Sequence, residues 1–174
     1  MKVIAFAASN SKKSINKQLV TYAASLLEDA QVEVLDLNDY ELPLFSVDKE
    51  EELGQPQLAQ DFVAKITASD ALIISFAEHN GSYAAAYKNL FDWGSRVNNK
   101  IFQDKPAVFL ATSPGAGGAA NVLAAAVNSA PHFKADLKAS LSVPSFKQNF
   151  DSEKGYLTNK ALNEQLIAAI SHLQ

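Results

Sequence analysis

The feature that most constrains this chain is a regular alternation of short apolar runs with longer segments of helical periodicity. The apolar runs occupy residues 3–8, 32–37, 70–77 and 106–113, with a weaker one within 137–143. Helical periodicity occupies residues 14–29, 56–68, 83–95, 118–129 and 159–172. Continuous apolar strands alternating with helices indicate a parallel sheet that is covered on both faces. The sequence therefore predicts an α/β fold, a doubly wound three-layer sandwich around a five-stranded parallel sheet.

Ligand sites in such folds have a fixed place. Whether the fold is flavodoxin-like or Rossmann-like, ligands bind beyond the carboxyl ends of the strands, where the strand order reverses. The loops after the first, third and fourth strands are therefore the candidates. The 174 residues suit a single domain over 1–174. Residues 39–57 are irregular and charged, and we expect a solvated loop leading into a helix, with ELPLF as a lid or a dimer contact.

Composition removes several classes of function. The chain has no cysteine, which excludes disulfides, thiolate catalysis and cysteine-bound metal centres. We see no spacing typical of metal ligands and predict no metal. A net charge of −4 argues against a nucleic-acid partner. Neither a signal peptide nor an apolar run long enough for the membrane is found, so we expect a cytoplasmic protein with no membrane partner.

The first loop is rich in hydrogen-bond donors. AASNSKKSINKQL, residues 7–19, follows the first apolar run and leads into a helix. Ser9, Ser11 and Ser14 offer hydroxyl groups, Asn16 offers an amide, and the helix N-terminus adds free N–H groups and partial positive charge. A single serine would be read as an N-cap. Several serines beside two lysines favour a phosphate monoester, although simple capping stays open.

The other two loops carry different signals. AEHNGS, residues 77–82, contains an Asn-Gly turn signal, and Ser82 is placed to cap the next helix. TSPGAGG, residues 112–118, has three glycines that allow close approach of backbone to a flat ring. Together the three loops suit a ligand with a phosphate at one end and a planar, hydrogen-bonding ring at the other. Flavin mononucleotide (FMN) has that shape.

These residues resemble the NAD(P)H-dependent FMN reductase family, a flavodoxin-like group that includes chromate, quinone and azo-dye reductases. The family's first loop, Gly-Ser-x-Arg-x-x-Ser-x-Asn, is similar to residues 8–16, with Ala8 for the glycine and Ser11 for the arginine. Its Pro-Glu-Tyr-Asn motif, followed by Leu-Lys-Asn-x-x-Asp-Trp, resembles residues 77–80 and 87–93, with His79 for the tyrosine. A third, glycine-rich motif resembles residues 113–118.

The resemblance implies a set of cofactor-binding residues. The FMN phosphate would be held by Ser9, Ser11, Ser14, Ile15 and Asn16. The isoalloxazine would be lined by Glu78, His79, Asn80 and Gly81 on one side and by Ser113 and Gly115 on the other. The helix with Lys88, Asn89, Asp92 and Trp93 would help to build a homodimer or homotetramer. Losing the arginine removes a charged phosphate donor, which Lys12 or Lys13 would have to replace.

The resemblance also implies an activity. A single FMN-binding domain would pass a hydride from NADH or NADPH through FMN to a quinone, flavin, azo compound or similar acceptor. No residue is required as a general base, so the catalytic residues are left unassigned. Two alternatives stay open. One is a flavodoxin-type electron carrier without NAD(P)H turnover. The other is a flavodoxin-like hydrolase or transferase that acts on nucleotides.

Overall fold

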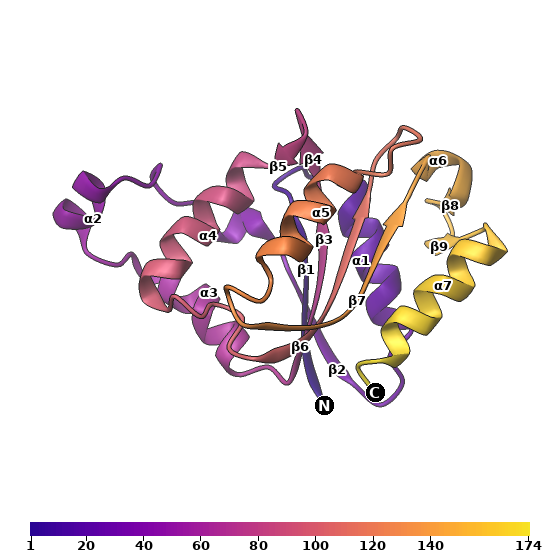
Figure 1. Ribbon diagram of the computed structural model, residues 1–174, viewed down its shortest axis with the longest axis horizontal. Coiled ribbons are helices and arrows are strands. Elements are labelled where there is room, and N and C mark those ends of the chain that lie inside the picture. The colour runs from indigo at the N-terminus through magenta and orange to yellow at the C-terminus, as the bar shows by residue number, and fades with distance from the viewer.

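The computed structural model describes all residues, 1–174. Five parallel strands form the central sheet in the order β2-β1-β3-β6-β7 (Figure 1). Their bounds are Lys2–Ala8 for β1, Gln31–Leu35 for β2, Ala71–Phe76 for β3, Lys105–Thr112 for β6 and Ala135–Val143 for β7. The inner strands are buried along nearly their whole length, whereas β2 and β7 are partly exposed. The predicted α/β fold with a five-stranded parallel sheet is confirmed.

Helices cover both faces of the sheet, as Figure 1 shows. On one face lie α1 (Ile15–Ser25) and α7 (Lys160–Ser171), and on the other lie α3 (Gln57–Thr67), α4 (Ala85–Val97) and α5 (Ala120–Ser129). Alternate residues of the central strands feed the two cores, since successive strand side chains point to opposite faces. In β1, Ile4 and Phe6 pack toward α3, α4 and α5, while Val3 and Ala5 pack toward α1 and α7.

The main departures from the expected elements are short additional helices and strands. They are the 3-10 helix η1 (Leu37–Tyr40), α2 (Val47–Leu53), β4 (Glu78–His79), β5 (Ser82–Tyr83), α6 (Phe146–Asn149), β8 (Phe150–Asp151) and β9 (Tyr156–Leu157). The segment expected to be a solvated loop therefore contains a helix, and α2 projects from the body beyond α4 (Figure 1). Its apolar residues, Val47 and Leu53, stand at its two ends, so no amphipathic pattern marks this helix in the sequence, and none of its residues is buried.

The strand order places one reversal between β1 and β3. The chain moves outward from β1 to β2 and then crosses back to β3 on the other side of β1. Loops that leave neighbouring strands on either side of such a reversal separate and leave a crevice at the carboxyl edge. The loops after β1 and β3 are the two that flank this reversal. None of the helices has the length and apolar character that crossing a membrane requires.

Candidate functional site

The loop after β1 is a compact turn with free backbone donors. Ser14 is the N-cap of α1, and its hydroxyl oxygen accepts from the Lys17 N–H at 3.1 Å. The hydroxyl oxygen of Ser9 accepts from the Ser11 N–H at 3.1 Å, and both Ser9 and Ser14 are buried. The N–H groups of Ile15 and Asn16, at the start of α1, donate to no protein acceptor. The loop therefore presents unpaired donors where the helix dipole is positive.

Some charged side chains around this loop form ion pairs and others do not. Lys12 and Lys13 are exposed and form no ion pair. Lys17, one turn into α1, is paired with Asp36 at the end of β2. The hydrogen bond from Lys17, helped by one from the Asn38 N–H, lowers the pKa of Asp36 to about 2. Asp36 is thus neutralised by its own partner, and Lys12 and Lys13 are left to attract an anion.

The Asn16 side chain turns away from the loop and joins three elements. Its amide nitrogen donates to the Thr112 carbonyl oxygen at 3.1 Å, and its amide oxygen accepts from the Thr112 N–H at 3.1 Å. The same oxygen accepts from the Ser75 hydroxyl at 2.8 Å. All three residues are buried. Asn16 therefore offers an anion its backbone N–H, while its side chain fixes α1 against the carboxyl ends of β3 and β6.

The loop after β3 is a tight hairpin of β4 and β5. Asn80 and Gly81 are its central residues, with φ of 53° and 75°. Positive φ at both positions is what a type I′ turn needs, so the predicted turn is confirmed. The predicted capping role of Ser82 is wrong. Ser82 pairs with His79 in the hairpin, and α4 begins after Ala84 without a side-chain cap.

Glu78 connects this hairpin to the loop after β6. Its carboxylate accepts from the Val122 N–H at 2.9 Å and from the Asn121 side-chain amide at 3.4 Å, in the first turn of α5. A carboxylate at a helix N-terminus satisfies unpaired donors and complements the dipole. Glu78 therefore positions the hairpin over α5. The next three predicted residues, His79, Asn80 and Gly81, are exposed at the hairpin tip.

The loop after β6 is open at its tip and closely packed at its base. Gly115 and Gly117 have no atom within 4 Å of where a Cβ would stand. Gly118 has φ +59°, and a Cβ there would lie 2.3 Å from the Ser142 hydroxyl oxygen. The Ser113 and Gly115 carbonyl oxygens accept from the loop after β7 at 3.0 and 2.9 Å. The tip leaves room for a ligand while the base fixes the loop.

These contacts bring the predicted residues to one edge of the sheet. Asn16 ties the first loop to the end of β6, Glu78 ties the hairpin to α5, and the hairpin and the loop after β6 project from the same end of the sheet (Figure 1). A hollow of about 320 Å³ borders this edge between Asn10, η1 and the start of α4. No three His, Cys, Asp or Glu side chains converge as metal ligands would.

With this geometry in view, the matching family model decides the family. A model described as NADPH-dependent FMN reductase matches residues 1–146, which include all three loops. The chain belongs to the NADPH-dependent FMN reductase family.

Individual relatives agree with this family. The chain is 31% identical to a probable NADPH:quinone oxidoreductase 2 of Oryza sativa subsp. japonica, over 68% of this chain and 59% of that protein. It is 33% identical to an NAD(P)H-dependent FMN reductase of Pseudomonas aeruginosa, over 69% of this chain and 64% of that protein. The match thus spans less than two thirds of either relative. A flavoenzyme NAD(P)H:(acceptor) oxidoreductase from Paracoccus denitrificans superposes with a TM-score of 0.77 at 25% identity, over 99% of this chain and 94% of that one.

The donor set at the edge fits the FMN after which this family is named. A phosphate needs several N–H and O–H donors and a positive charge to balance its own. The first loop supplies the N–H groups of Ile15 and Asn16, serine hydroxyls and two unpaired lysines. A flat ring needs open backbone beside it, and Gly115 and Gly117 supply that.

Three polar residues that support the edge were not singled out from the sequence. They are Ser75, Thr112 and Asp36. One signal was available for Ser75, because it is a polar residue within the apolar run 70–77, and a buried hydroxyl requires a partner. Nothing local to the sequence shows that this partner is Asn16, 59 residues earlier.

Proposed function

We propose that this chain is an NAD(P)H-dependent FMN reductase, a single FMN-binding domain that passes a hydride from NADH or NADPH through FMN to a quinone, flavin, azo or similar small acceptor. The observation that supports this best is the joined edge. The Asn16 side chain joins the loop after β1 to the end of β6, and Glu78 joins the hairpin after β3 to α5. The three loops therefore lie at the edge where α1 presents its free N–H groups. The family to which the chain belongs supports the same activity.

In this proposal each loop has its own task. Ser9, Ser11 and Ser14, with the N–H groups of Ile15 and Asn16, hold the phosphate of FMN. Glu78, His79, Asn80 and Gly81 lie along one side of the isoalloxazine, and Ser113 and Gly115 along the other. Ser9 and Ser14 keep their hydroxyl protons for the phosphate, since their oxygens accept from backbone N–H groups.

When bound, FMN supplies the redox chemistry by accepting a hydride and releasing electrons to an acceptor. The chain's own residues bind and orient. The open tip at Gly115 and Gly117 lets backbone approach the ring closely, and the Glu78 contact holds the hairpin in place. His79 is exposed at the hairpin tip and is the one histidine at this edge, but no contact commits it to proton transfer. We assign no catalytic residue.

Steady-state oxidation of NADH and NADPH by the FMN-loaded protein, with a soluble quinone as acceptor, tests the activity. The proposal predicts saturable turnover that depends on FMN. Binding of FMN without turnover with any acceptor would favour a flavodoxin-type electron carrier. Failure to bind FMN at all would favour a hydrolase or transferase that acts on nucleotides, the alternative that needs no flavin.

The proposal includes a homodimer or homotetramer. Helix α4 contributes to it indirectly, because its side chains hold the chain segment that follows η1. Asn89 donates to the Leu42 and Pro43 carbonyl oxygens at 3.1 Å and accepts from the Phe45 N–H, and the Trp93 ring N–H donates to Pro43. Trp93 itself is fully buried. These contacts present an arm, residues 44–53, that is rich in charge but carries three exposed apolar side chains: Leu44 is 82%, Val47 63% and Leu53 47% exposed.

The arm can be tested by sedimentation. We expect Leu44→Lys to shift the protein toward monomer, because a lysine would be desolvated in the interface. The control is Ile167→Lys on α7, which is 46% exposed on the opposite face of the sheet and should leave the assembly intact. A monomeric wild-type protein would contradict the arm as an interface.

The proposal also places the protein in the cytoplasm, where NAD(P)H is supplied, with no nucleic-acid or membrane partner. Cell fractionation tests this location.

A further inference from the structure

The loop after β6 divides its polar backbone groups into two sets. The carbonyl oxygens of Ser113, Gly115 and Gly118 accept hydrogen bonds from other protein groups. The N–H groups that donate to no protein acceptor are those of Ser113, Gly115, Ala116 and Gly117. The tip of this loop is exposed, so these donors stay available to a ligand while the acceptors are engaged by the protein.

The turn that follows β7 holds two of these acceptors. The Ser145 N–H donates to the Gly115 carbonyl oxygen at 2.9 Å, and the Phe146 N–H donates to the Ser113 carbonyl oxygen at 3.0 Å. The start of α6 therefore lies beside the loop after β6, as Figure 1 shows. Ser145 has the left-handed backbone conformation, with φ of 47° and ψ of 55°. Turns of this kind can direct successive N–H groups toward the same side.

The left-handed conformation is unfavourable for a serine, because its Cβ lies too close to the carbonyl oxygen that follows. Residues in such conformations persist where the surrounding contacts fix them, and they gather at functional sites. The Ser145 side chain makes no capping hydrogen bond to α6. The contacts that keep Ser145 in this conformation therefore come from other residues.

Asn149 supplies such contacts. Its amide nitrogen donates to the Pro144 carbonyl oxygen at 2.8 Å and lies 3.5 Å from the Ser145 carbonyl oxygen. Its amide oxygen accepts from the side chain of Asn159, the N-cap of α7, at 3.0 Å. Its own carbonyl oxygen accepts from the Thr158 N–H at 2.8 Å. Asn149 therefore links the turn after β7 to the start of α7.

We propose that Asn149 is a positioning residue for the flavin site. Its side chain holds the turn at residues 144–145, and the turn holds the loop after β6 with its donors free for the flavin ring. This inference rests on the proposed function and deepens it, because it adds a residue that acts on the side where Ser113 and Gly115 lie. Asn149 and Asn159 both lie beyond residues 1–146, which the family model matches. No hydrogen bond joins Asn149 to a residue proposed to hold FMN, so its effect passes through the turn.

Amide hydrogen exchange of the flavin-free, full-length protein tests the link from Asn149 to the loop. Asn149→Ala should speed exchange of the Ser145 and Phe146 amide protons threefold to tenfold, the effect of losing one hydrogen bond that supports the turn. The amide protons of the β4–β5 hairpin, on the other side of the site, should keep their rates. Equal acceleration in that hairpin would show a general loosening, and unchanged rates at Ser145 and Phe146 would show no link; either result would overturn the proposal.

Titration with FMN and with riboflavin tests the link from the loop to the flavin. Asn149→Ala should weaken both ligands by the same factor, threefold to tenfold, because the turn acts on the ring side and leaves the phosphate donors of α1 in place. Unchanged affinity for both flavins, or a loss confined to FMN, would overturn the positioning role. Wild-type protein that binds neither flavin would contradict the proposed function, and the exchange rates would still decide whether Asn149 holds the loop.

A second variant separates the hydrogen bond to Pro144 from the size of the side chain. Asn149→Asp keeps the size and the oxygen that accepts from Asn159, but it has no donor for the Pro144 carbonyl oxygen. It should therefore reproduce both effects of Asn149→Ala. Wild-type exchange rates and flavin affinities in Asn149→Asp would overturn the role of this hydrogen bond.

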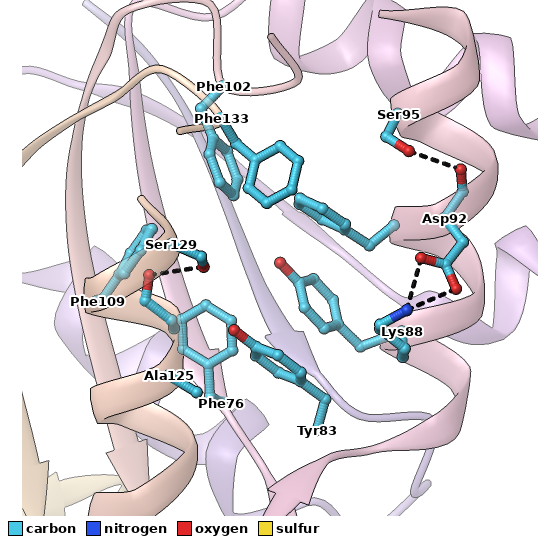
Figure 2. Close-up of a pocket in the computed structure, with 13 residues that line it drawn as sticks. Phe76, Tyr83, Lys88, Asp92, Ser95, Phe102, Phe109, Ala125, Ser129 and Phe133 are labelled. Carbon is cyan, nitrogen blue, oxygen red and sulfur yellow. Dashed lines mark hydrogen bonds and ion pairs between the residues drawn. The ribbon is translucent and has the colours of Figure 1, made fainter. Parts of the chain in front are cut away.

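The control is Ser129→Ala on α5, the helix that follows the loop. The Ser129 hydroxyl donates to the Ala126 carbonyl oxygen at 3.1 Å, beside the hollow between α4 and α5 that Figure 2 shows. The variant removes one hydrogen bond between side chain and backbone, and it should leave both the exchange rates at residues 145–146 and the flavin affinities unchanged. Equal effects of Ser129→Ala and Asn149→Ala would overturn the proposal.

Discussion

At the scale of single residues, Asn16 shows how a side chain can serve a ligand site without facing the ligand. Its backbone N–H lies unpaired at the N-terminal end of α1, while its side chain makes three hydrogen bonds to Ser75 and Thr112. These hydrogen bonds fix the first loop to β3 and β6. Its unpaired donors are thereby held at a constant position relative to the loop after β6. The resemblance to the family identified the position but not this division of work.

Truncating Asn16 should therefore destabilise the fold. Asn16→Ala leaves a buried Thr112 N–H and the Ser75 hydroxyl without their partner, and we expect a loss of about 3 kcal/mol in the free energy of unfolding. Ser75→Ala removes one bond and should cost about 1 kcal/mol. Urea denaturation measures both. Equal losses for the two variants would show that the network is not shared through Asn16.

Ser11 stands where the family pattern has an arginine, and the position is exposed beside the unpaired donors. Ser11→Arg should add one charge-assisted contact to the FMN phosphate, of about 1.5–3 kcal/mol, so affinity should rise about tenfold or more. Equilibrium titration of FMN measures this. Ser152→Arg adds the same charge on the exposed β8–β9 hairpin and serves as control. The same gain in both variants would mean that only net charge matters.

The Lys17–Asp36 pair gives the stability a pH dependence. Because the folded pKa of Asp36 is about 2, below its ordinary 3.8, the stabilisation is complete above about pH 4 and is lost as the pH falls toward 2. Both side chains are a third or more exposed, which limits the effect to about 1 kcal/mol or less. Asp36→Asn should remove this part of the acid dependence in denaturation curves, and Asp48→Asn, at an exposed carboxylate without an ion pair, should retain it.

At the scale of elements, the site depends on how the loop after β6 packs on its neighbours. Gly118 has positive φ, and a Cβ there would lie 3.1 Å from the Pro144 backbone nitrogen as well as against Ser142. No side chain fits at this position without moving the loop after β7. Gly117, its neighbour, lies in open space. The two glycines look alike in sequence, yet one fixes the base of the loop and the other frees its tip.

This contrast predicts opposite results for adjacent substitutions. Gly118→Ala should cost about 1–3 kcal/mol in the free energy of unfolding and weaken FMN binding, because the conformation and the contacts both oppose a methyl group. Gly117→Ala should change stability by less than about 0.5 kcal/mol. Chemical denaturation and FMN titration of the pair measure this. Loss of stability in Gly117→Ala alone would reverse the assignment of base and tip.

At the scale of the whole molecule, the architecture followed from the sequence because its strongest signals are periodic. Largely apolar strands such as residues 70–77 and amphipathic helices such as α3 are local patterns. The Asn80-Gly81 turn could also be predicted from the sequence, since its conformation depends on those two residues. The role of Glu78 was not readable, because its partner Val122 lies 44 residues later.

The measurement that tests the central claim most directly is titration of the flavin-free protein with FMN, followed by quenching of flavin fluorescence. If the loops after β1, β3 and β6 form one cofactor site, quenching should saturate at one equivalent of FMN per chain. Riboflavin, which lacks the phosphate, should bind at least tenfold more weakly, because the donors at the start of α1 would have no anion to bind. Quenching that never saturates, or equal affinity for FMN and riboflavin, would contradict a phosphate site at α1.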